Sequence, residues 1–187
     1  MTSQDNLFKI DEDGFLFHVK QIESPNYDLR PPNQTISLIV IHCISLPPNK
    51  FDNSNIEDFF SNKLKINRHT YFKKIKDLKV SSHFLIKRKG ELMQFVSCLN
   101  KAWHAGDSSW KNKKNCNDFS IGIELEGSDV IKYEDIQYKV LKKLLKSLRM
   151  KYPVIDIVGH SDIAPGRKTD PGDVFDWKLI NAENFNV

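Results

Sequence analysis

One apolar run limits the possible folds of this chain more than any other stretch, namely Ser37-Leu38-Ile39-Val40-Ile41. The run is continuous and rich in β-branched residues, which predicts a β-strand buried on both faces. A second run, Val154 to Val158, is expected to form another short strand. Each run is followed closely by a histidine, His42 in one case and His160 in the other. If both strands lie in one sheet, the two imidazoles emerge at the same edge.

Strand and helix patterns alternate along the rest of the chain. The expected elements are a short strand at Phe15–Val19, helices at Asn55–Leu64, Glu134–Met150 and Trp177–Asn181, strands at Ser82–Lys87, Glu91–Val96 and Phe119–Gly127, an irregular basic segment at 65–79 and a polar loop at 107–118. The strands at 82–87 and 91–96 are joined by a glycine-containing turn, which is a hairpin signal. This order predicts an α/β fold in a single domain, with a central mixed β-sheet flanked by helices.

Composition excludes several classes of function. The chain has 187 residues, enough for one domain with a hydrophobic core, and a net charge of +4. Its lysine-rich stretches read as a solvated basic surface, without the aromatic interleaving or the known module of a nucleic-acid-binding protein. No apolar run approaches the roughly 18–20 residues of a membrane span, and the N-terminus shows no secretion signal. Three cysteines, an odd number, favour a reducing compartment. We therefore expect a cytoplasmic monomer that has no nucleic-acid or membrane partner.

The segment from Val158 to Gly172 combines two prolines and three glycines with a histidine, two aspartates, an arginine and a lysine. This mixture predicts an ordered loop rather than a regular helix or a central strand. His160 and Asp170 from this loop, together with His42, form a three-ligand set for a catalytic Zn²⁺ site whose fourth position is left to water. The spacing alone is weak evidence, and two histidines satisfied by hydrogen bonds at strand ends are the alternative.

A hydrolytic zinc site also needs a base to take a proton from water and a cation for the developing oxyanion. Glu124, on a strand in otherwise apolar surroundings, is the candidate base. Lys168, two residues before Asp170, is the candidate cation. Glu126, on the same side of the strand as Glu124, is assigned to structural support.

A series of motifs resembles a known family. In chain order they are Ser24-Pro25-Asn26-Tyr27-Asp28, Ile41-His42, Val80-Ser81-Ser82-His83, Ala102-Trp103-His104-Ala105-Gly106, Cys116-Asn117-Asp118-Phe119, Gly159-His160 and Arg167-Lys168-Thr169-Asp170-Pro171-Gly172. Together they resemble the zinc N-acetylmuramoyl-L-alanine amidases of the amidase-2 family, especially the cytosolic branch that cleaves 1,6-anhydro-N-acetylmuramoyl peptides in cell-wall recycling. The resemblance runs from about Ser24 to Trp177, so we expect a catalytic core at 24–180 and a peripheral N-terminal arm at 1–23.

The resemblance implies a role for each matching residue. His42, His160 and Asp170 match the zinc ligands of the family, Glu124 matches its general base, and Lys168 matches its transition-state cation. The implied reaction is hydrolysis of the amide between the lactyl group of N-acetylmuramic acid and L-alanine of the stem peptide. The expected partner is therefore a muropeptide substrate.

Five further residues are expected at the substrate. Trp103 and His104 lie in a family motif and are predicted to border the sugar or the peptide. Cys43, Lys79 and Asn115 stand where cytosolic members usually carry Asn, Arg and Arg, which predicts altered affinity or peptide preference. For Cys43, a small buried residue and an additional soft ligand are further readings.

A non-catalytic peptidoglycan-fragment binding protein on the same fold is the alternative function. Relatives that only bind have lost ligands, whereas this chain retains all three ligands, the base and the cation. A nucleic-acid-binding protein or a metal nuclease is a third reading that rests on charge alone.

Overall fold

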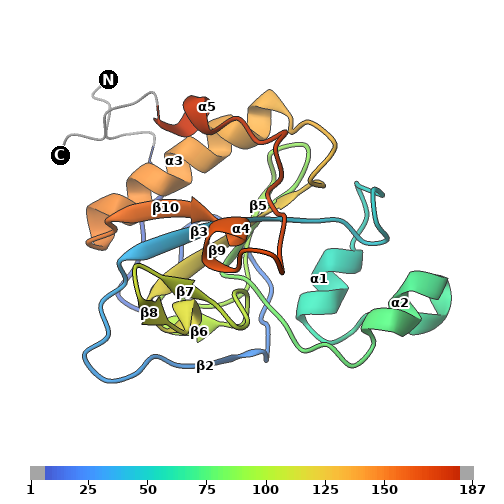
Figure 1. The fold of residues 1–187 in the computed structure, drawn as a ribbon, viewed down its shortest axis with the longest axis horizontal. Coiled ribbons are helices and arrows are strands. Elements are labelled where there is room, and N and C mark those ends of the chain that lie inside the picture. Colours follow the sequence, from blue (N-terminus) through green and yellow to red (C-terminus); the bar gives the residue numbers. More distant parts are fainter. Residues whose placement is uncertain (1–6, 182–187) are drawn as a thin grey trace.

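A six-stranded mixed β-sheet forms the centre of the computed structural model, which describes residues 7–181 (Figure 1). The strands follow the order β1 (Lys20–Gln21), β5 (Leu92–Gln94), β4 (Phe84–Ile86), β9 (Ser120–Glu126), β3 (Leu38–Ile44) and β10 (Asp156–Gly159). From β4 to β10 all neighbours are parallel, whereas β4 and β5 form the predicted antiparallel hairpin. The prediction of a single α/β domain with a mixed sheet is confirmed.

Strand β3 lies between β9 and β10 and is buried on both faces, as predicted. Ile39 and Ile41 belong to the hydrophobic cluster on one face of the sheet, and Leu38 and Val40 to a cluster on the other. The strand is longer than the apolar run, because it continues to Ile44. The histidine that follows the run is therefore held within the strand ladder.

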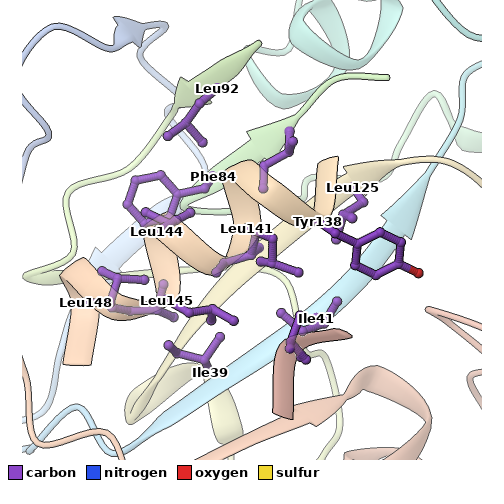
Figure 2. Close-up of a cluster of buried hydrophobic side chains, with 14 of the residues drawn as sticks. Ile39, Ile41, Phe84, Leu92, Leu125, Tyr138, Leu141, Leu144, Leu145 and Leu148 are labelled. Carbon is purple, nitrogen blue, oxygen red and sulfur yellow. The ribbon is translucent and has the colours of Figure 1, made fainter. Parts of the chain in front are cut away.

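The long helix α3 (Asp135–Lys151) covers one face of the sheet (Figure 1). Its buried leucines pack against the strands, as their helical spacing predicts: Leu141, Leu144, Leu145 and Leu148 (Figure 2). Gln137 fixes the start of the helix, because its Oε1 accepts a hydrogen bond from the N–H of Glu134. The Nε2 of Gln137 donates to the carbonyls of Ile86 and Glu126, which ties α3 to two strands. The predicted short helix α5 (Trp177–Asn181) lies beside α3 (Figure 1).

Two short helices form a separate wall beside the sheet, α1 (Asn55–Phe60) and α2 (Thr70–Ile75), with the 3-10 turn η1 (Ile66–Arg68) between them. Helix α1 is shorter than the predicted helix at 55–64, and the prediction of an irregular segment at 65–79 is wrong. Phe72 and Ile75, three residues apart, are both buried in α2. The lysines between and around them conceal this apolar side in the sequence.

The predicted polar loop at 107–118 contains more regular structure than expected. It holds the antiparallel pair β7 (Ser109–Trp110) and β8 (Lys113–Lys114), followed by the 3-10 turn η2 (Cys116–Asp118). A further antiparallel pair joins β2 (Tyr27–Leu29) to β6 (Asn100–Ala102). Cys116 and Phe119 pack on the side of the sheet that carries Leu38 and Val40. This segment therefore covers the face that α3 leaves open.

Residues 7–23, which belong to the expected N-terminal arm, contact α3 through Phe8, whose N–H donates to Ser147 Oγ at 2.9 Å, and then reach the β5 edge of the sheet. Strand β1 pairs with β5 as the outermost strand, and Leu16 is buried in the core. The strand predicted at Phe15–Val19 is not formed; the region has an isolated bridge between Ile10 and Leu16 instead. Within residues 7–181, no helix combines the length and the apolarity needed to cross a membrane.

Candidate metal centre and active site

The two predicted histidine ligands meet at the carboxyl edge of the parallel strands. His42 lies near the end of β3, and His160 follows β10 directly. Ile41 of β3 and Gly159 of β10 are partners in the ladder. The strand pairing therefore places the two imidazoles side by side, and the segment after His160 returns Asp170 to them.

The segment at 158–172 is not a loop throughout, which corrects the prediction. Its start completes β10, and His160 opens the one-turn helix α4 (His160–Ile163). Asp162 closes this turn, because its Oδ2 accepts a hydrogen bond of 2.7 Å from the N–H of Gly159. His160 is thus fixed between a strand and a capped helical turn.

Three donor atoms converge on one point. His42 Nδ1 lies 2.9 Å from His160 Nδ1 and 3.2 Å from Asp170 Oδ2, and His160 Nδ1 lies 3.1 Å from Asp170 Oδ2. Two imidazole nitrogens and one carboxylate oxygen are a ligand set of catalytic Zn²⁺ sites with an open fourth position. Ligand atoms about 2.0–2.1 Å from a tetrahedral ion lie roughly 3.3 Å from one another. The observed separations are close to that value, so the three residues fit a zinc ion.

The protonation states also suit a metal. Burial lowers the pKa of His42 to about 4, so this ring is neutral at pH 7. Burial raises the pKa of Asp170, but the close contacts of its carboxylate with His160 and His42 outweigh that effect, and the net pKa lies well below its usual range. A neutral imidazole and an ionised carboxylate are the forms that bind metal ions.

The outer nitrogen of each ring has a partner of its own. His160 Nε2 donates to the carbonyl oxygen of Ala105 at 3.1 Å, and His42 Nε2 lies 2.9 Å from His104 Nδ1. Such contacts behind a ligand fix the orientation of its ring. Both rings consequently turn Nδ1 toward Asp170.

Glu124 lies next to His42 in the sheet, because the two are register partners on β9 and β3. Its carboxyl group is buried, and its Oε2 has no hydrogen-bond partner. Burial raises the pKa of Glu124 well above its usual value, the charge of Asp170 adds to the rise, and Lys168 opposes it. A carboxyl oxygen without a partner, beside a metal-ligand set, is suited to take a proton from water.

A cavity of about 520 Å³ opens over these groups. The three predicted ligands, Glu124 and Lys168 all line it. Its other walls come from the end of β3 and the segment after it (Cys43–Leu46, Pro48 and Asn49), from the α1–α2 wall, and from residues 127–130 after β9. A volume of this size is typical of a small-molecule or short-peptide site.

Three of the five predicted substrate residues line the cavity, namely Cys43, Trp103 and His104. The indole Nε1 of Trp103 donates to Asp28 Oδ2 at 2.9 Å, which fixes the ring on the wall. Burial raises the pKa of Cys43 to about 12. Among the described residues, the donor atoms that converge as a possible metal site are those of His42, His160 and Asp170, so the reading of Cys43 as an additional ligand is not supported.

Lys79 and Asn115 do not line this cavity. Lys79 borders a separate small depression beside α2, and Asn115 precedes η2 in a left-handed backbone conformation (φ 59°). The structure does not bring these two residues to the other predicted site residues.

Arg167, for which the sequence predicted no role, lines the cavity beside Lys168. Its Nη2 donates to the carbonyl oxygen of Ala105 at 2.7 Å and to that of Asp107 at 2.6 Å. The Ala105 carbonyl is also the acceptor for His160 Nε2. Arg167 therefore supports the group that orients a ligand ring; its place on the ligand-bearing loop was the only signal in the sequence.

Known proteins similar to this chain are amidases. Residues 32–173 match the Amidase_2 family, described as N-acetylmuramoyl-L-alanine amidase. The chain is 46% identical over 173 residues to the 1,6-anhydro-N-acetylmuramyl-L-alanine amidase AmpD of Citrobacter freundii, covering 91% of this chain and 92% of that protein.

Solved structures give the same result. A crystal structure of a selenomethionine AmpD derivative has a TM-score of 0.90 at 46% identity and covers 92% of this chain and 97% of its own. A complex of the N-acetylmuramyl-L-alanine amidase AmiD from E. coli with the substrate anhydro-N-acetylmuramic acid-L-Ala-D-gamma-Glu-L-Lys has a TM-score of 0.57 at 28% identity, covering 92% of this chain and 64% of that one. This chain therefore belongs to the N-acetylmuramoyl-L-alanine amidase family, in its AmpD-like branch.

Proposed function

We propose that this protein hydrolyses the amide bond between the lactyl group of 1,6-anhydro-N-acetylmuramic acid and L-alanine of the stem peptide, in the recycling of peptidoglycan fragments. The main support for this proposal is that His42, His160 and Asp170 converge in one cavity. The carboxyl group of Glu124, which has an oxygen without a hydrogen-bond partner, lies beside them. An amidase of this family needs both a metal-ligand set and a base, and both occur together here.

Zinc is the metal that we assign to this centre, with His42 Nδ1, His160 Nδ1 and Asp170 Oδ2 as its protein ligands. When bound there, zinc supplies a Lewis acid that polarises the scissile carbonyl and lowers the pKa of water toward ~7. The donor atoms and their neutral or ionised forms are those that zinc requires.

Glu124 and Lys168 are assigned the two other catalytic roles, proton transfer and stabilisation of the oxyanion. Glu124 accepts a proton from the attacking water at its unpartnered Oε2 and returns it to the departing amine of L-alanine. Lys168 places a positive charge at the cavity, where it stabilises the negative oxygen that develops on the lactyl carbonyl. Closeness of the two side chains is supported by the effect of Lys168 on the pKa of Glu124.

The substrate is a muropeptide, by analogy with the AmiD complex, whose ligand is an anhydro-N-acetylmuramoyl peptide. The indole ring of Trp103, fixed by Asp28, provides an apolar face for a sugar ring. Cys43 borders the same space and is assigned as a substrate contact. All three cysteines are free thiols, which fits the reducing cytoplasm in which we place the reaction. We assign the active form as a monomer, since every proposed catalytic group comes from one chain.

The test is turnover of two substrates by zinc-loaded protein, with and without a chelator. An anhydro-muropeptide and polymeric murein are incubated separately, and free stem peptide is measured by mass spectrometry. We expect release from the anhydro-muropeptide, a much lower rate from polymeric murein, and loss of both on chelation. If the zinc-loaded protein releases no peptide from either substrate, the proposal is wrong and the non-catalytic binder becomes the better reading.

A further inference from the structure

A chain of hydrogen bonds runs from the backbone to the metal centre through a residue that is not a ligand. It begins at Ser120, whose hydroxyl donates to the carbonyl oxygen of Cys116 at 2.6 Å. A carbonyl oxygen only accepts, and a hydroxyl has a single hydrogen. The Ser120 oxygen is therefore an acceptor toward any other partner.

That other partner is His104, whose Nε2 lies 3.1 Å from Ser120 Oγ. Since Ser120 accepts, Nε2 of His104 carries the proton. His104 is buried, and its two ring nitrogens face the Ser120 hydroxyl and the His42 imidazole rather than a carboxylate. An unpaired charge is unfavourable at a buried site, so these contacts fit a neutral ring whose one proton is on Nε2. Nδ1 of His104 is consequently a lone-pair acceptor.

The acceptor faces His42, because His104 Nδ1 lies 2.9 Å from His42 Nε2. His42 Nε2 must then donate, which leaves the lone pair of a neutral His42 on Nδ1. This Nδ1 is the atom that lies 2.9 Å from His160 Nδ1 and 3.2 Å from Asp170 Oδ2. In this series, each hydrogen bond decides which atom donates in the next one. The series starts at the backbone carbonyl of Cys116, which can only accept.

Packing holds His104 in the position that this chain requires. A Cβ atom on Gly122 would lie 2.5 Å from His104 Cγ, so the ring rests directly on the bare backbone of β9. The ring meets His42 edge to face at 5.0 Å between centroids, and His83 at 5.7 Å. His83 is fixed in turn, since its Nδ1 accepts from the N–H of Gly122. His104 has little room to rotate.

We propose that His104 is a positioning residue that sets the tautomer and the ring orientation of His42 for zinc, and that Ser120 and Gly122 serve it. This inference rests on the zinc site proposed above and changes the role of His104 from a substrate contact to a support behind a ligand. The residues that hold His104 in place, Ser120 and Gly122, lie on β9. A motif read along the sequence does not reveal that they contact His104.

Two substitutions of His104 distinguish a role as hydrogen-bond acceptor from a role in packing alone. His104→Phe keeps the ring shape and removes the acceptor, whereas His104→Asn loses volume but retains an amide oxygen near the place of Nδ1. Removing a partner behind a metal ligand typically weakens metal affinity by roughly 10–100-fold. We expect such a loss of Zn²⁺ affinity for His104→Phe and an affinity closer to wild type for His104→Asn, measured by competition with a chromogenic chelator. The reverse order, with His104→Phe near wild type, overturns the proposal.

Gly122→Ala is a third variant, which leaves the chemistry of His104 unchanged and displaces its ring. It should weaken Zn²⁺ binding in the same range as His104→Phe. If it binds Zn²⁺ like the wild type, the packing part of the proposal is wrong.

The wild-type protein provides a test that needs no variant to fold. Long-range ¹⁵N–¹H NMR spectra of the zinc-free protein report which ring nitrogen carries the proton. We expect protonation at Nε2 in both His104 and His42. A proton on Nδ1 of His104 overturns the inference even if the variants do not fold. If the wild type fails to bind Zn²⁺, the zinc site itself is wrong; if it binds Zn²⁺ and the His104 results contradict expectation, only the positioning role is wrong.

Discussion

The carboxyl groups of Glu124 and Glu126 stand two positions apart on β9 and have opposite surroundings. Glu126 is fully buried and accepts hydrogen bonds from the backbone N–H groups of Asp52 and Arg88, each at 3.0 Å, while Lys87 Nζ lies 3.1 Å from its Oε1. Glu124 has a carboxyl oxygen with no partner at all. One strand thus carries a carboxylate whose hydrogen bonds are satisfied and, two positions away, the unsatisfied carboxyl group that we propose as the base.

Glu124→Gln should lower turnover strongly and leave the metal site intact. The amide cannot accept a proton from water, and positioned bases contribute roughly 10²–10⁴-fold to rates. We expect a fall of that size in kcat, with one Zn²⁺ per chain retained by elemental analysis. Loss of Zn²⁺ in this variant would mean that Glu124 is a ligand and that the assigned roles are incorrect.

Glu126→Gln should lower the stability of the protein and leave its turnover unchanged. The change leaves Lys87 buried beside Glu57 alone and disturbs the two backbone donors. Breaking a buried ion pair on one side costs about 3–5 kcal/mol, which urea unfolding will measure. The rate per folded molecule should stay near the wild-type value, and a fall in kcat at full folding would give Glu126 a part in catalysis.

Lys168→Met should lower kcat without lowering Zn²⁺ affinity. Loss of one donor to a developing oxyanion typically costs roughly 10²–10³-fold in kcat. Lys79→Met is the matched control, since Lys79 is exposed and does not line the cavity. Equal losses in the two variants would show that general surface charge, rather than the position of Lys168, supports the reaction.

Removal of zinc should destabilise the protein as well as inactivate it. At a free Zn²⁺ concentration of 100 times Kd, binding to the folded state alone contributes about 2.7 kcal/mol. For a chain of this length that corresponds to a rise in Tm of roughly 5–11 °C. Thermal unfolding with Zn²⁺ and with a chelator measures it, and an unchanged Tm would contradict binding at a preformed buried site.

Cys43 should resist alkylation although it borders the cavity. The thiolate is the reactive form, and burial raises the pKa of this thiol to about 12. At pH 8 only about one molecule in 10⁴ would then carry a thiolate at this position. Iodoacetamide at pH 8, followed by peptide mass mapping, should leave Cys43 unmodified in folded protein and modify it after unfolding. Rapid labelling in the folded state would show that the thiol is activated.

Local patterns were enough to predict most of the framework. The apolar run that became β3, the spacing of leucines in α3 and the glycine-containing hairpin each carry their own signal. Helix α2 was missed because its two buried residues, Phe72 and Ile75, are surrounded by lysines that read as an irregular basic surface. Helix α4 was missed because a one-turn helix depends on its Asp162 cap more than on any periodicity.

The site was predictable only in part, for a different reason. His42, His160 and Asp170 could be proposed together because strand ends and a family motif point to them. The pairing of His42 with His104, and the support of Ala105 by Arg167, depend on segments that meet only in the folded chain. Lys79 and Asn115 were placed by comparison with positions in a family, and the surrounding backbone directs them elsewhere.

The ligands of this centre also bear on the order in which the protein folds. His42 and Asp170 are separated by 128 positions along the chain. A metal held by both would close a loop that contains most of the protein, and it would form only after the long-range pairing of β3 with β9 and β10. Such pairing comes late because the entropy of loop closure is lost before the contacts are gained. During synthesis on the ribosome, the chain would therefore acquire its metal last, after Asp170 has emerged.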